Sequence, residues 1–255
     1  MKHKKPSKAT RSRMNLDERF RQLRTNIEFS QFDQNLKVIN IVSTFPNEGK
    51  STVALNLAKT YGVQYDKVLL IDCDLRNPSI HKLMSLSNAE GLSNLMTHFK
   101  GDEDLLKMSE VKKVDINGER SIYVLTSGQR VPNPQELLSS KKFRQLLEMA
   151  KQQMNMVIVD CPPCMAVSDA IPVCNAADGT LFVISSKDTD KAAAKEGMNE
   201  LQRNGANIIG AILTKAEEAN HKHGYYYSYD YGYGYGYGYG YGSQDDGDDD
   251  DQKKE

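Results

Sequence analysis

Long apolar segments are missing from this sequence. No run of apolar residues approaches the ~20 that a membrane-spanning helix requires, so we expect no such helix. The basic start of the chain, residues 1–5, is not followed by the apolar stretch of a secretory signal peptide. Together these absences predict a cytosolic protein.

Cysteine is also scarce. The four cysteines stand in apolar surroundings and are too few for a disulfide framework. Cys161 and Cys164 have the CxxC spacing found in redox and zinc sites, but no second CxxC pair is present to complete a zinc site. We therefore expect the cysteines to be small buried side chains, with a redox or metal role as the alternative.

The net charge of -1 conceals two oppositely charged ends. Residues 1–13 contain six Lys or Arg and no acid, whereas residues 245–251 are almost all aspartate. The basic arm, residues 1–14, can lie on an anionic membrane surface, where each Lys or Arg adds about 1 kcal/mol. A solvated, disordered arm is the alternative interpretation.

One stretch has the order of a phosphate-binding P-loop. An apolar, β-branched run at 38–42 leads into a Gly-Lys-Ser-Thr turn, and a helix-forming stretch follows. A helix N-terminus presents unpaired N–H groups and the positive end of its dipole to phosphate. Gly49 lets the backbone approach, Lys50 reaches the β- and γ-phosphates, and the Ser51 hydroxyl can bind Mg²⁺. The full pattern G-x-x-x-x-G-K-[ST] fails at Thr44, which stands where the first glycine should be.

The predicted strands are continuous apolar runs that alternate with predicted helices. This pattern indicates an α/β fold, a P-loop NTPase-like parallel sheet covered by helices on both faces. We expect the charged residues 100–120 to be irregular surface. The strands are predicted near 38–43, 67–71, 121–126, 156–160, 179–185 and 208–213, and the helices near 15–32, 53–59, 90–95, 135–153 and 189–204.

Charged residues follow two of these strands. Asp72, Asp74 and Arg76 end the second, and Asp160 ends the fourth. Because parallel sheets bind ligands beyond the carboxyl ends of their strands, we expect these side chains to meet Lys50 in one crevice. Asp160 then fits a Walker B acid, which holds Mg²⁺ directly or through water. Of Asp72 and Asp74, one can serve the metal while the other accepts a proton, and Arg76 can offset phosphate charge.

The C-terminal composition differs from that of the rest of the chain. Residues 225–241 hold ten of the 13 tyrosines, and the segment ends in a Tyr-Gly repeat from Tyr231 to Gly242. Glycine alternation opposes helix and no apolar core residues remain, so we expect residues 216–255 to be disordered. Such a coil has an r.m.s. reach on the order of 25 Å between Thr214 and Tyr233. That distance spans a neighbouring subunit's crevice.

Four segments together resemble the bacterial tyrosine kinases, the P-loop kinases of capsule and exopolysaccharide operons. Residues 43–51, 70–78 and 157–163 resemble the Walker A, A′ and B motifs of that family, and residues 128–138 are similar to a further family segment. The resemblance covers about residues 15–215 and the tyrosine cluster. It implies ATP-dependent autophosphorylation of C-terminal tyrosines, largely between subunits of a ring-shaped oligomer.

The same resemblance implies roles for particular residues. ATP and Mg²⁺ are the implied cofactors, and Asp72 is the implied base for the tyrosine hydroxyl. The implied sets are catalytic Lys50, Asp72, Asp74 and Arg76; ATP-binding Phe45, Pro46, Asn47, Glu48, Gly49, Lys50, Ser51 and Thr52; metal-binding Ser51, Asp74 and Asp160; and the phosphoacceptors Tyr225, Tyr226, Tyr227, Tyr229, Tyr231, Tyr233, Tyr235, Tyr237, Tyr239 and Tyr241.

The resemblance also implies partners. An oligomerisation helix is implied at 15–32, because the family's oligomer-interface motif is matched by Glu18, Arg21 and Arg24. Without the resemblance, these residues indicate only a solvated helix face. In the Gram-positive type a separate membrane adaptor activates the kinase, so we expect recruitment to the inner face of the cell membrane. We also expect a cognate tyrosine phosphatase and no nucleic-acid partner.

Two departures and two alternatives remain. Thr214 stands where related ATPases usually read adenine with asparagine, and the tail is unusually repetitive. A partitioning-type ATPase is one alternative, although Phe45 stands where those proteins carry an extra lysine. A non-catalytic regulatory scaffold, with the tail as a multivalent binding tag, is the other.

Overall fold

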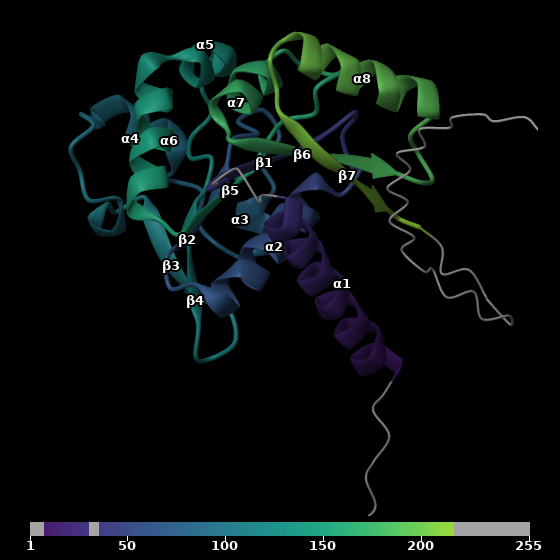
Figure 1. Ribbon diagram of the computed structural model, residues 1–255. Helices are drawn as coiled ribbons and strands as arrows, with labels where there is room; N and C mark the ends of the chain where they lie inside the picture. Colours follow the sequence, from purple (N-terminus) through teal and green to yellow (C-terminus); the bar gives the residue numbers. More distant parts are fainter. Residues whose placement is uncertain (1–7, 31–35, 217–255) are drawn as a thin grey trace, which may run out of the picture. The chain divides into compact units, whose positions relative to one another are not determined.

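The computed structural model describes residues 8–30 and 36–216. Residues 217–255 of the expected disordered tail, with all ten expected phosphoacceptor tyrosines, lie outside the described residues. Within them, seven strands form one sheet, and six of the strands run parallel (Figure 1). The strands are β1 Val38–Ser43, β2 Val68–Asp72, β3 Val111–Asp115, β4 Ser121–Leu125, β5 Met156–Asp160, β6 Gly179–Ser185 and β7 Ile208–Thr214.

The strand order is β3-β4-β2-β5-β1-β6-β7, so the predicted parallel α/β sheet is confirmed. The prediction of irregular structure for residues 100–120 was wrong, because β3 pairs antiparallel with β4 at one edge. This strand has only two apolar residues, Val111 and Val114, around a pair of lysines. Charged edge strands of this kind resist pairing with other chains and carry no continuous apolar signal.

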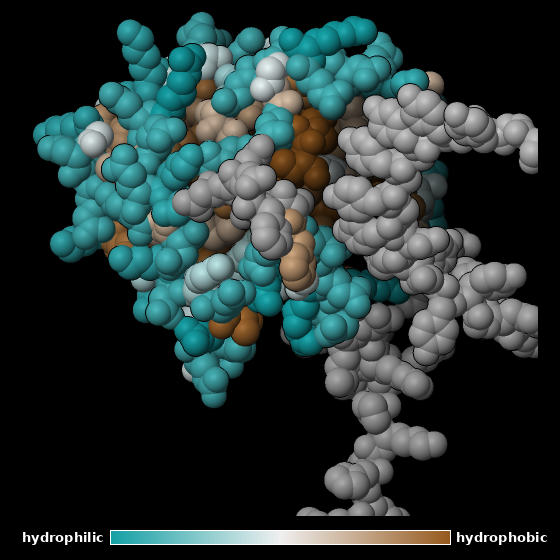
Figure 2. All heavy atoms as spheres, in the orientation of Figure 1, coloured by the Kyte–Doolittle hydropathy of each residue, from teal (hydrophilic) through white to brown (hydrophobic). Residues whose placement is uncertain are grey.

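Helices cover both faces of the sheet (Figure 1). The described helices are α1 Lys8–Ser30, α2 Lys50–Gln64, α3 Ile80–Leu83, α4 Leu92–His98, α5 Pro134–Ser139, α6 Lys141–Gln153, α7 Ala170–Ala176 and α8 Lys191–Arg203, with a 3-10 turn at Leu105–Lys107. Side chains of α4 to α8 pack on one face, and those of α1 to α3 on the other. Figure 2 shows that the outer surfaces of α4, α6 and α8 are mainly hydrophilic.

Each of the five predicted helices overlaps a helix of the structure, but the described residues form eight α-helices and several bounds differ. α1 begins at Lys8, so the second half of the expected basic arm is helical. The single helix predicted near 135–153 is broken at Ser140, whose hydroxyl accepts the N–H of Phe143 at 3.1 Å and caps α6. The short helices α3 and α7 have no counterpart in the prediction.

The four cysteines are free and buried, as expected for small core side chains. Cys161 and Cys164 are both enclosed in the core beside β5. Burial raises the pKa of the Cys161 thiol, which keeps it protonated and unreactive. In the described part of the chain, no helix is both long and apolar enough to cross a membrane.

Candidate active site

Three neighbouring strands, β2, β5 and β1, end at the same edge of the sheet. Asp72 and Asp160 are the last residues of β2 and β5, and they stand opposite each other in the parallel register. β1 leads into the loop before α2, so Lys50 begins that helix at the same edge. The predicted crevice therefore forms, because parallel pairing brings distant segments of sequence to one place.

The loop between β1 and α2 has a backbone shaped to approach phosphate. Gly49 precedes the helix with φ +95°, a conformation that residues with a Cβ rarely adopt. Asn47 also has a positive φ, 65°, which asparagine tolerates better than most residues. Thr44 is not among the described residues with positive φ. A side chain is therefore accommodated without strain where the P-loop pattern has its first glycine.

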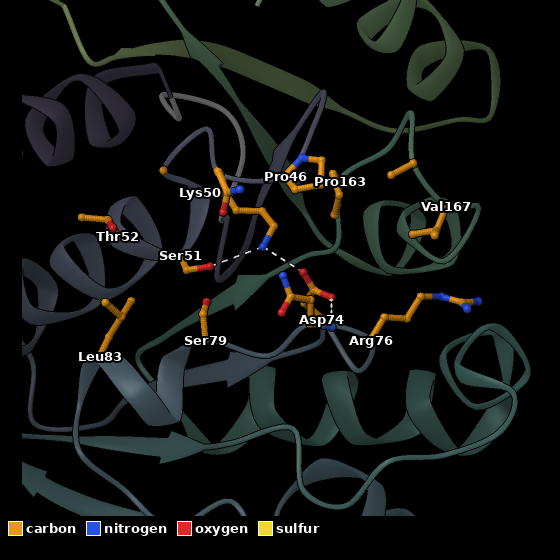
Figure 3. Close-up of a pocket in the computed structure, with 14 residues that line it drawn as sticks. Pro46, Lys50, Ser51, Thr52, Asp74, Arg76, Ser79, Leu83, Pro163 and Val167 are labelled. Carbon is orange, nitrogen blue, oxygen red and sulfur yellow. Dashed lines mark hydrogen bonds and ion pairs between the residues drawn. The ribbon is translucent and has the colours of Figure 1, made fainter. Parts of the chain in front are cut away.

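The ammonium group of Lys50 is surrounded by oxygen atoms. Its Nζ lies 3.0 Å from Oδ2 of Asp74 and donates to Oγ of Ser51 at 3.3 Å (Figure 3). The same atom lies 3.8 Å from Oδ1 of Asp160. Burial disfavours the charged form, but the charges of Asp160 and Asp74 outweigh it and raise the pKa of Lys50. Lys50 is therefore a fixed cation where a P-loop lysine meets the β- and γ-phosphates.

Asp160 is a fully buried carboxylate, and neither of its oxygens has a hydrogen-bond partner among the described residues. Burial raises its pKa, although the charge of Lys50 acts in the opposite direction. A buried carboxylate without hydrogen bonds is costly unless a ligand satisfies it. Carboxylate oxygen suits Mg²⁺, which usually takes one or two protein carboxylates and completes its shell with water and phosphate.

Asp72 is buried by its own backbone surroundings. Its Oδ1 accepts the N–H of Asp74 at 3.1 Å, and its Oδ2 accepts those of Ser79 and Ile80 at 3.2 and 3.1 Å. Burial, and next the charge of Asp160, raise the pKa of the Asp72 carboxyl. The structure thus separates the two aspartates, because Asp74 contacts Lys50 whereas Asp72 braces the turn that leads into α3.

A cavity of about 430 Å³ lies beside Lys50, a volume typical of small-ligand sites. Its lining includes eight of the residues predicted from sequence: Pro46, Asn47, Gly49, Lys50, Ser51, Thr52, Asp74 and Arg76. Four predicted residues do not line it: Phe45, Glu48, Asp72 and Asp160. The sequence analysis missed six that do: Asn77, Ser79, Leu83, Pro163, Ala166 and Val167. Asn77 and Pro163 fall inside the resembling motifs, but the other four carry no sequence signal.

Arg76 is held by a buried partner that the sequence analysis did not identify. Its Nε and Nη2 donate to the two carboxylate oxygens of Asp169 at 2.6 and 3.0 Å, and the Asp169 side chain is 1% exposed. In Figure 3 the Arg76 side chain extends away from Lys50 and Asp74. Arg76 therefore borders the cavity as half of a two-bond ion pair, and not as a free cation beside Lys50.

Glu48 shapes the loop from beneath and does not face the cavity. Its side chain is 1% exposed and accepts the N–H of Phe45 at 2.9 Å and the hydroxyl of Thr189. Burial raises the pKa of Glu48, against the lowering effect of the Phe45 hydrogen bond. The backbone carbonyl of Glu48 accepts the hydroxyl of Thr214 at 2.5 Å. Thr214 therefore ties the end of β7 to the loop.

The predicted interface residues lie on α1, apart from the cavity. Arg21 pairs with Glu18, one turn earlier on the same helix. The Nη1 of Arg24 donates to the carbonyl oxygen of Thr60 in α2 at 3.3 Å, and its Nε lies 3.6 Å from Oε1 of Glu28. The three residues of the motif are not gathered at one contact, and two of them line a second hollow between α1 and α2.

Comparison with known proteins identifies the family. A family model described as an AAA domain matches residues 36–215. The tyrosine-protein kinase YwqD of Bacillus subtilis (strain 168) is 42% identical over 204 residues, which are 80% of this chain and 83% of that protein. The chain belongs to the bacterial tyrosine-protein kinases. The putative tyrosine-protein kinase CapB of Staphylococcus aureus is 32% identical over 200 residues, 78% of this chain and 84% of its relative.

A solved structure agrees with this family. The kinase domain of the Escherichia coli tyrosine kinase ETK superposes with a TM-score of 0.69 at 34% identity, over 82% of this chain and 80% of that one. The resemblance stated from the motifs is therefore confirmed, and the protein is a protein-tyrosine kinase. This finding favours the kinase over the partitioning-type ATPase and the non-catalytic scaffold.

Proposed function

We propose that this kinase transfers the γ-phosphoryl group of ATP to the tyrosines of its own C-terminal segment, mainly between subunits, to regulate capsular or exopolysaccharide synthesis and chain length. The observation that carries the proposal is the position of Lys50. Its ammonium lies at the N-terminus of α2 and between the carboxylates of Asp74 and Asp160. That arrangement suits a phosphate group with its metal ion, and the acceptor cluster occupies residues 225–241 of the same chain.

ATP and Mg²⁺ fit the residues that are present. Ser51, Asp74 and Asp160 would hold the metal, and the first N–H groups of α2 with Lys50 would hold the phosphates. When bound, Mg²⁺ neutralises charge on the phosphate oxygens. Pro46, Asn47, Gly49 and Thr52 border the same cavity, whereas Phe45 and Glu48 shape the loop.

A carboxylate of the chain would accept the hydroxyl proton of the acceptor tyrosine. The tyrosine oxygen forms a bond to the γ-phosphorus, the bond to the bridging oxygen breaks, and ADP leaves. A phenol has a pKa of about 10, so its proton must pass to a base. The resemblance assigns that proton to Asp72. Because Asp72 is held by the N–H groups of Ser79 and Ile80, this role requires that turn to open, whereas Asp74 already borders the cavity.

Assembly and location belong to the same proposal. Glu18, Arg21 and Arg24 would contact a neighbouring subunit in a ring, which brings the tail of one subunit to the crevice of another. A membrane adaptor would recruit and activate the kinase at the inner face of the cell membrane. A cognate tyrosine phosphatase would reset the tail, since each phosphate adds about -1.5 to -2 charges.

Intact mass after incubation with Mg-ATP and the adaptor's cytosolic segment tests the proposal. Wild-type protein should gain several phosphoryl groups, localised by peptide mapping to Tyr225–Tyr241. Asp74→Asn should lose most of this gain, because it removes the carboxylate nearest to Lys50. Asp72→Asn should also lose it if that residue is the base.

ATP affinity and thermal unfolding of each variant separate chemistry from folding. Loss of phosphorylation with folding retained in Asp72→Asn supports the base assignment. Full phosphorylation in Asp72→Asn would instead assign the role of base to Asp74. No phosphorylation of wild-type protein despite ATP binding would favour a nucleotide-switched scaffold.

A further inference from the structure

One end of the cavity beside Lys50 is apolar. Pro46, Pro163, Ala166 and Val167 line it, together with the half-exposed Arg76 side chain. In Figure 3 the labelled members Pro46, Pro163, Val167 and Arg76 lie on one side of the Lys50 ammonium. Thr52 and Leu83 lie on the opposite side (Figure 3).

The position of Lys50 tells which end of a bound triphosphate faces this apolar wall. In a P-loop the N–H groups of the loop and the helix hold the inner phosphates, and the lysine reaches the β- and γ-phosphates. The γ-phosphate would therefore lie near the ammonium, and the rest of the nucleotide would extend towards Thr52. The wall made by Pro46, Pro163, Ala166 and Val167 borders the outer side of the γ position. An attacking acceptor must enter from this side, since attack occurs in line with the bond that breaks.

The wall is fixed to the phosphate loop by backbone hydrogen bonds. The N–H of Cys164 donates to the carbonyl of Ser43 at 2.9 Å, and the N–H of Met165 donates to that of Thr44 at 3.1 Å. The segment that carries Pro163, Ala166 and Val167 thus moves with the P-loop. Such rigid placement is what a reacting group needs for in-line attack.

Arg76 closes the wall with a planar surface. Two hydrogen bonds to the buried carboxylate of Asp169 fix the plane of its guanidinium group. A fixed guanidinium stacks well on an aromatic face. Asp169 is therefore a positioning residue, because it acts only through Arg76.

We propose that this wall, the residues Pro46, Pro163, Ala166 and Val167 with Arg76, binds the phenol ring of the acceptor tyrosine. The inference rests on the proposed phosphoryl transfer and names the acceptor subsite of the same cavity. A tyrosine has an apolar body and a polar tip, which matches apolar walls next to charged Lys50 and Asp74. The occupant is a tyrosine of residues 225–241 from a second copy of the chain. The last five of these tyrosines, Tyr233 to Tyr241, have glycine on both sides, so no neighbouring side chain obstructs their entry to the cavity.

Two synthetic peptides test the subsite on the full-length protein. One has the sequence of residues 232–236, Gly-Tyr-Gly-Tyr-Gly, and its analogue carries Phe at both aromatic positions. The Phe peptide cannot accept phosphate, so its binding measures the ring subsite without any transfer. Val167→Asp and the more exposed Ala166→Asp should raise the KM for the Tyr peptide about tenfold or more, since lost apolar contact of this size discriminates substrates by such factors. Both variants should weaken binding of the Phe peptide by a factor similar to the rise in KM. Their affinity for ATP should stay within about twofold of wild type.

Val167→Ile keeps an apolar side chain, so its KM for the Tyr peptide and its affinity for the Phe peptide should stay close to those of wild type. Leu213→Asp is the matched control. Leu213 is 61% exposed and does not line the cavity, so the same new charge there should leave both peptides unaffected. Asp169→Asn should raise the KM for the Tyr peptide and weaken the Phe peptide while Asp169→Glu partly restores both. Unchanged Phe-peptide binding in Val167→Asp and Ala166→Asp would overturn the inference. If wild-type protein binds the Phe peptide but transfers no phosphate, the proposed function fails and the ring subsite stands.

Discussion

Opposite charges meet in two regions of this kinase, and their surroundings differ. In the crevice, Lys50 and Asp160 are almost fully buried, and the oxygens of Asp160 have no hydrogen-bond partner among the described residues. On α1, the Arg21 and Glu18 side chains are 59% and 53% exposed and pair along one helix. Buried charges without full partners cost free energy and persist where a ligand uses them. Exposed pairs contribute little until another surface covers them.

The largest effect is expected at the buried charge that faces the cavity. Lys50→Met removes the only cation that contacts both Asp74 and Asp160 among the described residues. Tyrosine phosphorylation should fall by at least 10²- to 10³-fold, roughly the loss seen when one preorganised donor is removed. Phosphotyrosine mass shifts under Mg-ATP measure it. Lys195→Met, on the exposed side of α8, is the control and should retain activity. A fully active Lys50→Met would show that the crevice is not the catalytic centre.

A middle effect is expected at Asp178, a partly buried charge that has all its partners. Its carboxylate accepts the N–H groups of Lys37 and Val38 at 2.8 and 2.9 Å and pairs with Lys151. Although burial acts to raise it, the Lys151 and backbone hydrogen bonds lower the pKa of Asp178 below its usual value. Asp178→Asn should lower the free energy of unfolding by about 1–3 kcal/mol at pH 7, the cost of losing charge-assisted hydrogen bonds.

The pH dependence of that deficit has a definite sign. A carboxyl whose pKa is lower when folded stabilises the protein above its unfolded pKa and loses this effect as pH falls through the folded pKa. Denaturant unfolding should therefore show wild type and Asp178→Asn converging as the pH falls below about 4. Glu196→Gln on α8 serves as an exposed control that should not alter stability at either pH. A deficit that persists unchanged in acid would contradict the charge-based explanation.

The smallest effect on stability is expected on α1. Because Arg21 and Glu18 form an exposed pair one turn apart, Arg21→Ala should change the free energy of unfolding by about 0.5 kcal/mol or less. If the motif joins subunits, the same variant should reduce the oligomer to smaller species in light scattering. Lys82→Ala is a control because Lys82 is exposed on α3, away from α1. An unchanged oligomer would remove Arg21 from the interface proposal.

The sequence was most informative where a local pattern matched a local structure. Continuous apolar runs predicted all six parallel strands, and the Gly-Lys-Ser turn after the first of them predicted that a helix follows. The helix α2 begins at Lys50, three residues before the predicted stretch at 53–59. The edge strand β3 was missed because its two valines stand among lysines and its pairing with β4 supplies the order. The break at Ser140 was missed because apolar residues continue across it while a side-chain cap starts a new helix.

The candidate site was predicted in its chemistry and only partly in its geometry. Asp72 and Asp74 are two residues apart, and the sequence does not distinguish their roles. In the structure Asp72 accepts hydrogen bonds from the turn before α3, whereas Asp74 contacts Lys50. Glu48 lies inside the P-loop motif, yet its side chain points to Thr189 and not to the cavity. Each of these outcomes depends on neighbours contributed by another part of the chain.

The sequence by itself determined the fold class, the P-loop and the family, because these depend on residue order within short segments. Only the tertiary structure decided which side chains share the cavity. The ion pair between Arg76 and Asp169 and the wall that includes Pro163 and Val167 join segments from β2, β1 and the loop after β5. Packing of the sheet sets those distances, and no local pattern in the sequence records them.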